Sequence, residues 1–243
     1  MKEKNSEILF EKMTKNIRSY LKSDVRYNES FLPRPFMIEF TGSPSAGKTT
    51  TIIEMDKFLR RQGFRVLCPQ EGAQVVRHIE RTSPLYNICT GLYALRILID
   101  ESHGHLYDVI LFDRCIFDAY CWMMYWEEKG WSKTDMEMVK SFFLSKHWQD
   151  KIDISYFMVC DSDVAMKREE RIAATKKLGE TTNPETIKKL VSRYKKAYEI
   201  LKPDNPQLHL LDTTYMKEKE MVKKFSIEIL SILDQKAKDN SKK

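Results

Sequence analysis

The stretch FMIEFTGSPSAGKTT, residues 36–50, passes from an apolar run into glycines and small polar residues, and then into a lysine followed by threonines. Glycines let the backbone adopt positive φ angles and bring N–H groups close to a ligand, and a following helix adds its positive end. The stretch therefore predicts a strand, a phosphate-binding loop and a helix. Its centre fits G-x-x-x-x-G-K-[ST] without a mismatch: Gly42, Ser43, Pro44, Ser45, Ala46, Gly47, Lys48 and Thr49.

This loop predicts a site for the phosphates of a nucleoside triphosphate, with ATP and Mg²⁺ as the expected cofactors. Lys48 supplies a mobile positive charge, Thr49 offers a hydroxyl to the metal, and Thr50 completes the set of loop contacts. A glycine-rich turn with a solvated lysine is the alternative. No N-K-x-D segment follows in the sequence, which disfavours a guanine-specific GTPase.

The rest of the chain alternates between short apolar runs and segments with helical periodicity. Strands with helices between them predict a mostly parallel sheet covered on both faces, an α/β P-loop fold of three layers with five strands. Helix ends are also expected at Gly63, at Ser132 with Asp135, and at Asn183 followed by Pro184. The runs expected as strands are FMIEF, FRVLC, DVILF, ISYFMV and LHLLD.

The organisation expected along the chain has three parts. Residues 1–35 carry an amphipathic helix that Pro33 and Pro35 close off, and it is either a dimer contact or a flap packed on the main body. Residues 36–235 form the P-loop domain, with a helical lid at about 167–183. Residues 236–243 are polar and lysine-rich, and we expect a disordered tail.

The composition of the chain limits the kinds of molecule that it is expected to bind. The formal charge of +6, from 41 basic and 35 acidic residues, suits an anionic small molecule better than a nucleic acid. Five cysteines form no CxxC pair, which argues against zinc and a disulfide framework. No apolar run has the ~18 residues of a membrane span, and the charged start leads into no signal-peptide core. We therefore expect a cytoplasmic protein with no membrane partner, and a homodimer remains open.

Acidic residues follow two of the predicted strands. Asp113 directly follows DVILF and is expected to bind magnesium, with Arg114 beside it balancing phosphate charge. Glu71 lies just past the second strand and is expected to orient or deprotonate the attacking hydroxyl. Arg77 is a candidate contact to an acceptor phosphate. The alternatives are a helix-capping Asp113, an ordinary loop Glu71 and a solvated Arg77.

Together these features resemble the P-loop nucleoside and nucleotide kinases, particularly thymidylate and deoxynucleoside kinases. Ala165 and Arg168 match the A-x-x-R helix that leads into the arginine-bearing lid of those enzymes, and LHLLDTT is similar to their fifth strand, whose loop borders the adenine. DRCIFDAYCW is also similar to NadR-like kinases, whose acceptor is nicotinamide riboside. The resemblance implies magnesium-ATP as donor and in-line transfer to a nucleoside or nucleotide. The lid, RIAATKKLGETTN, departs from the family pattern because it lacks an arginine beside its glycine.

The lid and the acceptor side supply the remaining candidates. Arg168 and Arg171 can share a helix face and neutralise charge in the transition state, although interleaved glutamates are equally typical of a salt-bridged surface. The aromatic helix after Asp113 is mostly core, with one or two rings available to stack on an acceptor base. The candidate acceptor contacts are Tyr93, Arg96, Phe117 and Tyr120.

Three functions follow from this pattern. The first is a magnesium-ATP phosphotransferase acting on a nucleoside, a nucleoside monophosphate or a related metabolite such as nicotinamide riboside. The second is a nucleotide-binding regulator in which a bound triphosphate orders a loop. The third is a polynucleotide end kinase, which ranks last because the sequence shows no basic groove with interleaved aromatics.

Overall fold

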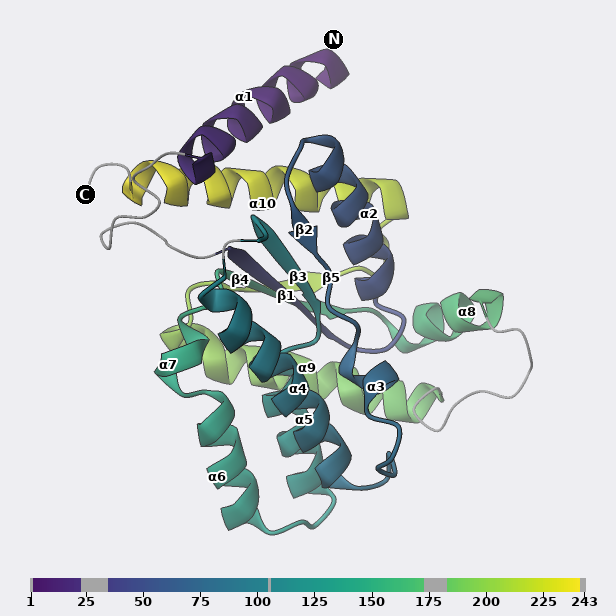
Figure 1. Ribbon diagram of the computed structural model, residues 1–243. Coiled ribbons are helices and arrows are strands. Elements are labelled where there is room, and N and C mark those ends of the chain that lie inside the picture. Colours follow the sequence, from purple (N-terminus) through teal and green to yellow (C-terminus); the bar gives the residue numbers. More distant parts are fainter. Residues whose placement is uncertain (1, 23–34, 105, 173–182, 241–243) are drawn as a thin grey trace.

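Five parallel strands form the centre of the fold (Figure 1) in the computed structural model, which describes residues 2–22, 35–104, 106–172 and 183–240. Their order across the sheet is β2-β3-β1-β4-β5, so the strand of the phosphate loop lies in the middle. The parallel five-stranded sheet is confirmed. The strands are β1 (Phe36–Gly42), β2 (Val66–Leu67), β3 (Val109–Asp113), β4 (Ile154–Val159) and β5 (Leu208–Asp212).

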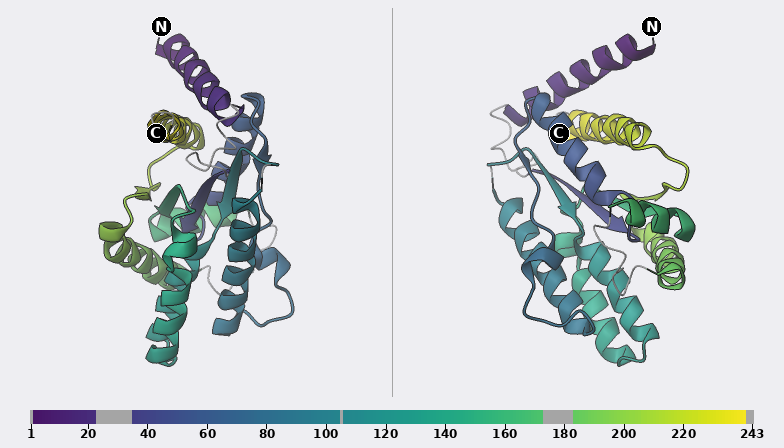
Figure 2. Two further views of the ribbon diagram at one scale, coloured as in Figure 1. Left: turned by 60° about the vertical axis from the view of Figure 1, so that its left-hand side comes forward. Right: turned by 90° about the vertical axis from the view of Figure 1, so that its right-hand side faces the viewer.

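Helices cover both faces of the sheet, as Figure 2 shows from two further directions. One face packs against α2, α10 and α1, and the other packs against α4, α5 and α9. The helices are α1 (Lys2–Lys22), α2 (Lys48–Arg61), α3 (Gly72–Val75), α4 (Pro84–Ser102), α5 (Ile116–Glu128), α6 (Lys133–Phe143), α7 (Lys146–Gln149), α8 (Ser162–Ile172), α9 (Pro184–Leu201) and α10 (Glu218–Asn240), with a 3-10 turn at Lys202–Asp204.

The two cores follow from the alternation of side chains along each buried strand. Phe36, Ile38 and Phe40 of β1 belong to the core under α2 and α10, whereas Met37 belongs to the core under α4, α5 and α9. Successive residues of a strand point to opposite faces, so a strand buried on both sides reads as a continuous apolar run. The polar exceptions in β1 are Glu39 and Thr41, which are both fully buried.

The predicted helix ends are confirmed. The side chain of Ser132 accepts a hydrogen bond from the backbone N–H of Asp135 at 3.3 Å, and that of Asn183 accepts one from Thr186 at 2.9 Å. Gly63 follows the end of α2 with a φ of 83°, a backbone conformation that favours glycine. These caps fix where the helices start and stop around the sheet.

The chain ends differ in part from expectation. Helix α1 packs along α10 of the same chain and buries Met13 and Ile17, so the arrangement is that of a packed flap. Helix α10 continues to Asn240 into the segment expected as a disordered tail. Its last turns carry side-chain pairs four residues apart, including Lys238 Nζ to Asp234 Oδ2 at 2.5 Å, which stabilise helix. Of the expected lid, residues 173–182 lie outside the described residues.

Candidate active site

The phosphate loop closes tightly on the neighbouring strand. Gly42 and Gly47 have φ angles of 135° and 92°, and Ser45 also adopts a positive φ, of 54°. A Cβ added at Gly42 would lie 1.8 Å from the backbone oxygen of Met158 in β4, so only glycine fits there. The positive φ angles turn the loop away from the strand direction and into the start of α2.

Lys48 is the buried cation of this loop. Its Nζ donates to the carbonyl oxygens of Ser43 at 2.8 Å and Gly42 at 3.2 Å, which hold the ammonium above the loop. Burial lowers the pKa of Lys48 to about 8, and the nearby positive charge of Arg114 adds to this effect. A polyphosphate bound in the loop would place negative charge beside Lys48 and so favour the charged form of its side chain.

Thr49 and Asp113 meet at the carboxyl edge of the sheet. The Thr49 hydroxyl donates to Asp113 Oδ2 at 2.6 Å, although the two residues are 64 positions apart. The other carboxylate oxygen, Oδ1, is buried and makes no hydrogen bond within the part of the chain described. A hydroxyl and a carboxylate with an uncommitted oxygen are hard donors that suit Mg²⁺, which takes few protein ligands and completes its shell with phosphate oxygens and water.

Magnesium therefore fits this pair. No group of three or more His, Cys, Asp or Glu side chains able to hold a metal occurs within the described ranges. A site of two protein oxygens agrees with that finding, since substrate phosphates supply the rest.

Arg114 connects the predicted acceptor side to the loop. Its φ is 70°, and its guanidinium donates to Glu71 at 3.0 Å, to Asp118 at 2.6 Å and to the Tyr194 hydroxyl at 3.0 Å. Burial raises the pKa of Glu71, against the opposing effect of Arg114. Glu71 precedes the short helix α3, and Arg114 precedes α5, so two loops at the same sheet edge bring the pair together.

Asp118 is the acceptor at the centre of this network. One of its oxygens accepts from the hydroxyls of Thr41 at 2.6 Å and Tyr194 at 2.8 Å, in addition to Arg114. Asp118, Thr41 and Tyr194 were not among the site residues predicted from the sequence. Asp118 follows Arg114 by four residues at the start of a helix, and that spacing was a usable signal. Tyr194 lies 80 residues beyond Arg114, and no local pattern indicates it.

Glu39 anchors the start of α5 from inside the sheet. Its carboxylate accepts backbone N–H groups of Cys115 at 2.8 Å, Asp118 at 3.0 Å and Phe117 at 3.4 Å. These are the N–H groups that the first turn of a helix leaves without partners. A side chain of β1 therefore fixes the helix that carries Asp118.

Helix α8, which carries the start of the segment expected as a lid, is attached to the phosphate loop. Arg168 donates to the backbone oxygens of Ser45 at 3.1 Å and Thr213 at 2.7 Å, and the Ser45 hydroxyl donates to Glu169 at 2.7 Å. Arg171 is exposed. The geometry thus places Arg168 at the loop, where it holds the backbone of β5's exit against the P-loop, and leaves Arg171 at the surface.

A cleft of about 1130 Å³ opens beside Glu71 and Arg114. Its wall is aromatic: the rings of Trp122 and Tyr125 lie edge to face with centroids 5.4 Å apart, and Tyr125 and Trp126 lie 4.9 Å apart. Tyr86 also lines the cleft, and its hydroxyl is buried without a partner among the described residues. The cleft is wide enough for a ring system and begins at the phosphate loop, because Pro44 borders it.

The acceptor contacts named from the sequence lie elsewhere. Phe117 is fully buried and Tyr120 is 8% exposed, both in the core under α4 and α5. The Arg96 side chain is 82% exposed and pairs with Asp100, and Tyr93 is half-buried on the same helix. Arg77 donates to the Gln74 carbonyl and borders an adjoining surface pocket within residues 73–81, which shares part of its lining with the cleft. None of these five lines the cleft, so their contact with an acceptor stays a prediction.

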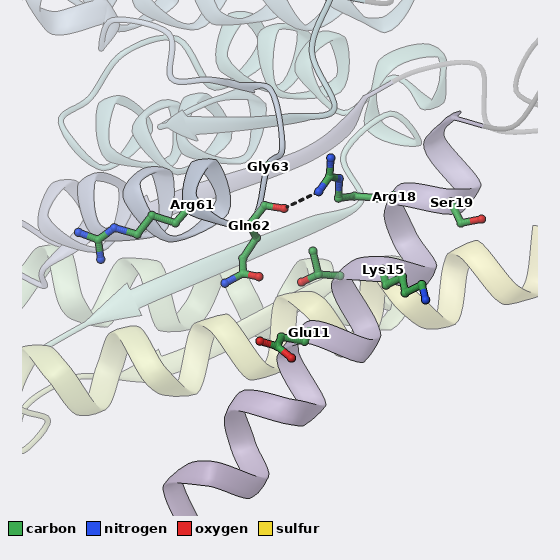
Figure 3. Close-up of a pocket in the computed structure, with 8 residues that line it drawn as sticks. Glu11, Lys15, Arg18, Ser19, Arg61, Gln62 and Gly63 are labelled. Carbon is green, nitrogen blue, oxygen red and sulfur yellow. Dashed lines mark hydrogen bonds between the residues drawn. The ribbon is translucent and has the colours of Figure 1, made fainter.

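A further cavity, of about 510 Å³, lies between α1 and the end of α2 (Figure 3). Arg18 of α1 reaches the carbonyl of Gln62 there at 3.4 Å. The cavity lies at the opposite end of α2 from the phosphate loop. The length of this helix, at 1.5 Å per residue, separates the two by about 20 Å. This cavity therefore belongs to the packing of the flap and not to the site of the P-loop.

The five-stranded parallel sheet, with a phosphate loop after its central strand, has the fold of the P-loop kinases. No protein-family model matches the sequence, and no curated protein does so either. Two solved structures of deoxyadenosine kinase from M. mycoides are similar in fold, one with bound dCTP and one with the products dCMP and a flexible dCDP. They are 16% and 17% identical to this chain, with TM-scores of 0.55 and 0.59.

Each of these alignments covers 81% of this chain and the whole of the other chain. At such identities the similarity establishes the architecture, and the chemistry must be argued from this chain's own residues. No helix in the described ranges is both long and apolar enough to cross a membrane.

Proposed function

We propose that this protein is a magnesium-ATP-dependent phosphotransferase whose acceptor is a nucleoside, a nucleoside monophosphate or a related small metabolite. The observation that carries the proposal is the meeting, at one sheet edge, of Lys48, the Thr49–Asp113 pair and the Glu71–Arg114 pair beside an aromatic cleft. In this proposal Lys48, Thr49 and Asp113 bind the phosphate donor. Glu71 and Arg114 contact the phosphate acceptor.

Each group has a role in the transfer. Backbone N–H groups of the loop and the ammonium of Lys48 bind the β and γ phosphates. Thr49 and Asp113 would hold magnesium, which supplies positive charge against the charge that develops on the phosphate oxygens. Glu71 takes the proton of the acceptor hydroxyl while that oxygen bonds to the γ phosphorus and the bond to the β-phosphate oxygen breaks.

Arg114 and Arg168 complete the electrostatics. Arg114 lies between Glu71 and Asp118 and keeps Glu71 near the position of an attacking oxygen. Raising the pKa of Glu71 by burial makes it a better base at neutral pH than an exposed carboxylate. Arg168 keeps the loop backbone in place through Ser45.

The test is an ATP-consumption screen with purified protein against nucleosides, their monophosphates and nicotinamide riboside. Lys48→Ala is expected to lower kcat/KM at least ~10²-fold, because one positioned charge at the transferring phosphate contributes that much. Glu71→Gln is expected to lower kcat with little change in ATP affinity. Turnover that survives Lys48→Ala refutes the assignment.

Other outcomes of the same screen identify the alternatives. Phosphorylation of nicotinamide riboside alone would identify a NadR-like activity. Tight triphosphate binding with no phosphorylated acceptor would instead favour a regulatory nucleotide-binding protein, because the phosphate loop would then work without the cleft.

A further inference from the structure

Asn87 of α4 has one fixed orientation in the wall of the cleft. It is 7% exposed, and its Oδ1 accepts a hydrogen bond from Trp126 Nε1 at 2.9 Å. The indole N–H is only a donor, so the oxygen end of the amide has to face Trp126. Trp126 is itself 6% exposed and held by edge-to-face contacts with Tyr125 and Trp131. The amide therefore cannot flip without losing a buried hydrogen bond.

The opposite end of the amide is consequently a hydrogen-bond donor aimed away from Trp126. Asn87 lines the cleft, and its Nδ2 donates to no acceptor within the described residues. Two of the carboxylates that line the cleft, those of Glu71 and Asp118, are paired with Arg114. Because Asn87 lines the cleft, a ligand bound there can accept a hydrogen bond from this N–H in place of water.

Thr90 supplies the complementary group one helical turn along α4. Its hydroxyl proton is committed to the backbone oxygen of Asn87 at 3.0 Å, so the oxygen is left to accept. Thr90 also lines the cleft, and residues three apart on a helix lie on the same face. The wall of the cleft thus presents a hydrogen-bond donor, the side-chain N–H of Asn87, beside a hydrogen-bond acceptor, the hydroxyl oxygen of Thr90.

We propose that this pair reads a lactam edge on the acceptor's ring, an oxo group beside a ring N–H, so that uracil-, thymine- or hypoxanthine-type bases are selected over cytosine and adenine. The oxo group accepts from Asn87, and the ring N–H donates to Thr90. Cytosine and adenine carry the reversed pattern, an amino group beside an unprotonated ring nitrogen, which sets donor against donor and acceptor against acceptor. This inference rests on the proposed function.

The experiment measures kcat/KM for two matched pairs, uridine with cytidine and inosine with adenosine, in ribo and 2′-deoxy forms. Wild-type protein is expected to favour the oxo member by about tenfold to a hundredfold, the range for a site with a committed hydrogen-bond pattern. Asn87→Asp has the same shape and presents an oxygen, and we expect the preference to fall at least about tenfold. Trp126→Phe keeps an aromatic ring but removes the indole N–H, so the Asn87 amide is free to rotate. The ratio of kcat/KM between the oxo and the amino nucleoside should then approach one in this variant.

Trp131→Phe is the matched control, because the Trp131 ring contacts Trp126, whereas the indole that donates to Asn87 is that of Trp126. It should retain the wild-type preference. A wild-type preference for the amino members, or a preference unchanged in both Asn87→Asp and Trp126→Phe, would overturn the inference while leaving a kinase in place. No turnover of any of these nucleosides, their monophosphates or nicotinamide riboside overturns the proposed function and this inference with it.

Discussion

Replacing Glu39 by Gln tests how a carboxylate is kept inside the sheet. Glu39 is fully buried in β1, and burial raises its pKa from 4.5 to about 8. The negative charge of Asp118 acts in the same direction, whereas the backbone N–H groups that Glu39 accepts lower the pKa. We expect desolvation to prevail, so that folded protein carries a protonated Glu39 at neutral pH.

The sign and size follow from linkage. Between pH 4.5 and 8 the unfolded chain has released this proton and the folded chain has not, so the free energy of unfolding falls as pH rises. The slope is about 1.4 kcal/mol per pH unit, and the whole effect is about 5 kcal/mol, comparable to the stability of many domains. Glutamine cannot titrate and still offers an oxygen to the start of α5, so its contribution does not change with pH.

The measurement is urea unfolding of wild type and Glu39→Gln at pH 5.5, 7.0 and 8.5. The difference in free energy of unfolding is expected to shift by about 3 kcal/mol in favour of the variant between the lowest and the highest pH. Glu199→Gln, an exposed glutamate on α9, is the control and should show no such shift. A difference that is the same at all three pH values would mean that the backbone donors keep Glu39 ionised, and the reasoning would be wrong.

Three further perturbations have defined outcomes. Because the pKa of Lys48 is about 8, triphosphate affinity measured by calorimetry should fall as pH rises above 8, by up to about tenfold per unit, and Lys48→Arg should abolish that fall. Gly42→Ala places a Cβ 1.8 Å from a backbone oxygen and should cost roughly 4 kcal/mol or more, so a soluble variant with wild-type Tm would contradict the loop geometry. Arg168→Ala should lower both Tm and nucleotide affinity, whereas Arg171→Ala, on an exposed residue, should leave Tm unchanged; equal effects would contradict the attachment of α8.

Local patterns predicted the parts of the fold that depend on neighbouring residues. The glycines and Lys48 indicated the loop, the apolar runs indicated the five strands, and Ser132 and Asn183 indicated helix starts. The end of α10 was missed because the polar composition of residues 236–243 outweighed the pairs four residues apart that support a helix there.

In the candidate site, local patterns predicted the position of some residues and misplaced others. Strand ends indicated Asp113 and Glu71, because the carboxyl edge of a parallel sheet collects the residues that follow its strands. Phe117 and Tyr120 were chosen as acceptor contacts for their aromatic rings, yet the rotation of α5 turns them into the core and turns Trp122 towards the cleft. The sequence does not contain that rotation, since α5 is apolar almost all round.

By itself, then, the sequence determined the phosphate loop, the parallel sheet and the edge at which chemistry is expected, because each depends on spacing along the chain. Only the tertiary structure decided that Tyr194 completes the Arg114 network, that Glu39 holds the start of α5, and that Trp126 fixes the amide of Asn87. These contacts join residues 39 to 80 positions apart. Their hydrogen bonds exist only where burial removes water and folding brings the partners within reach.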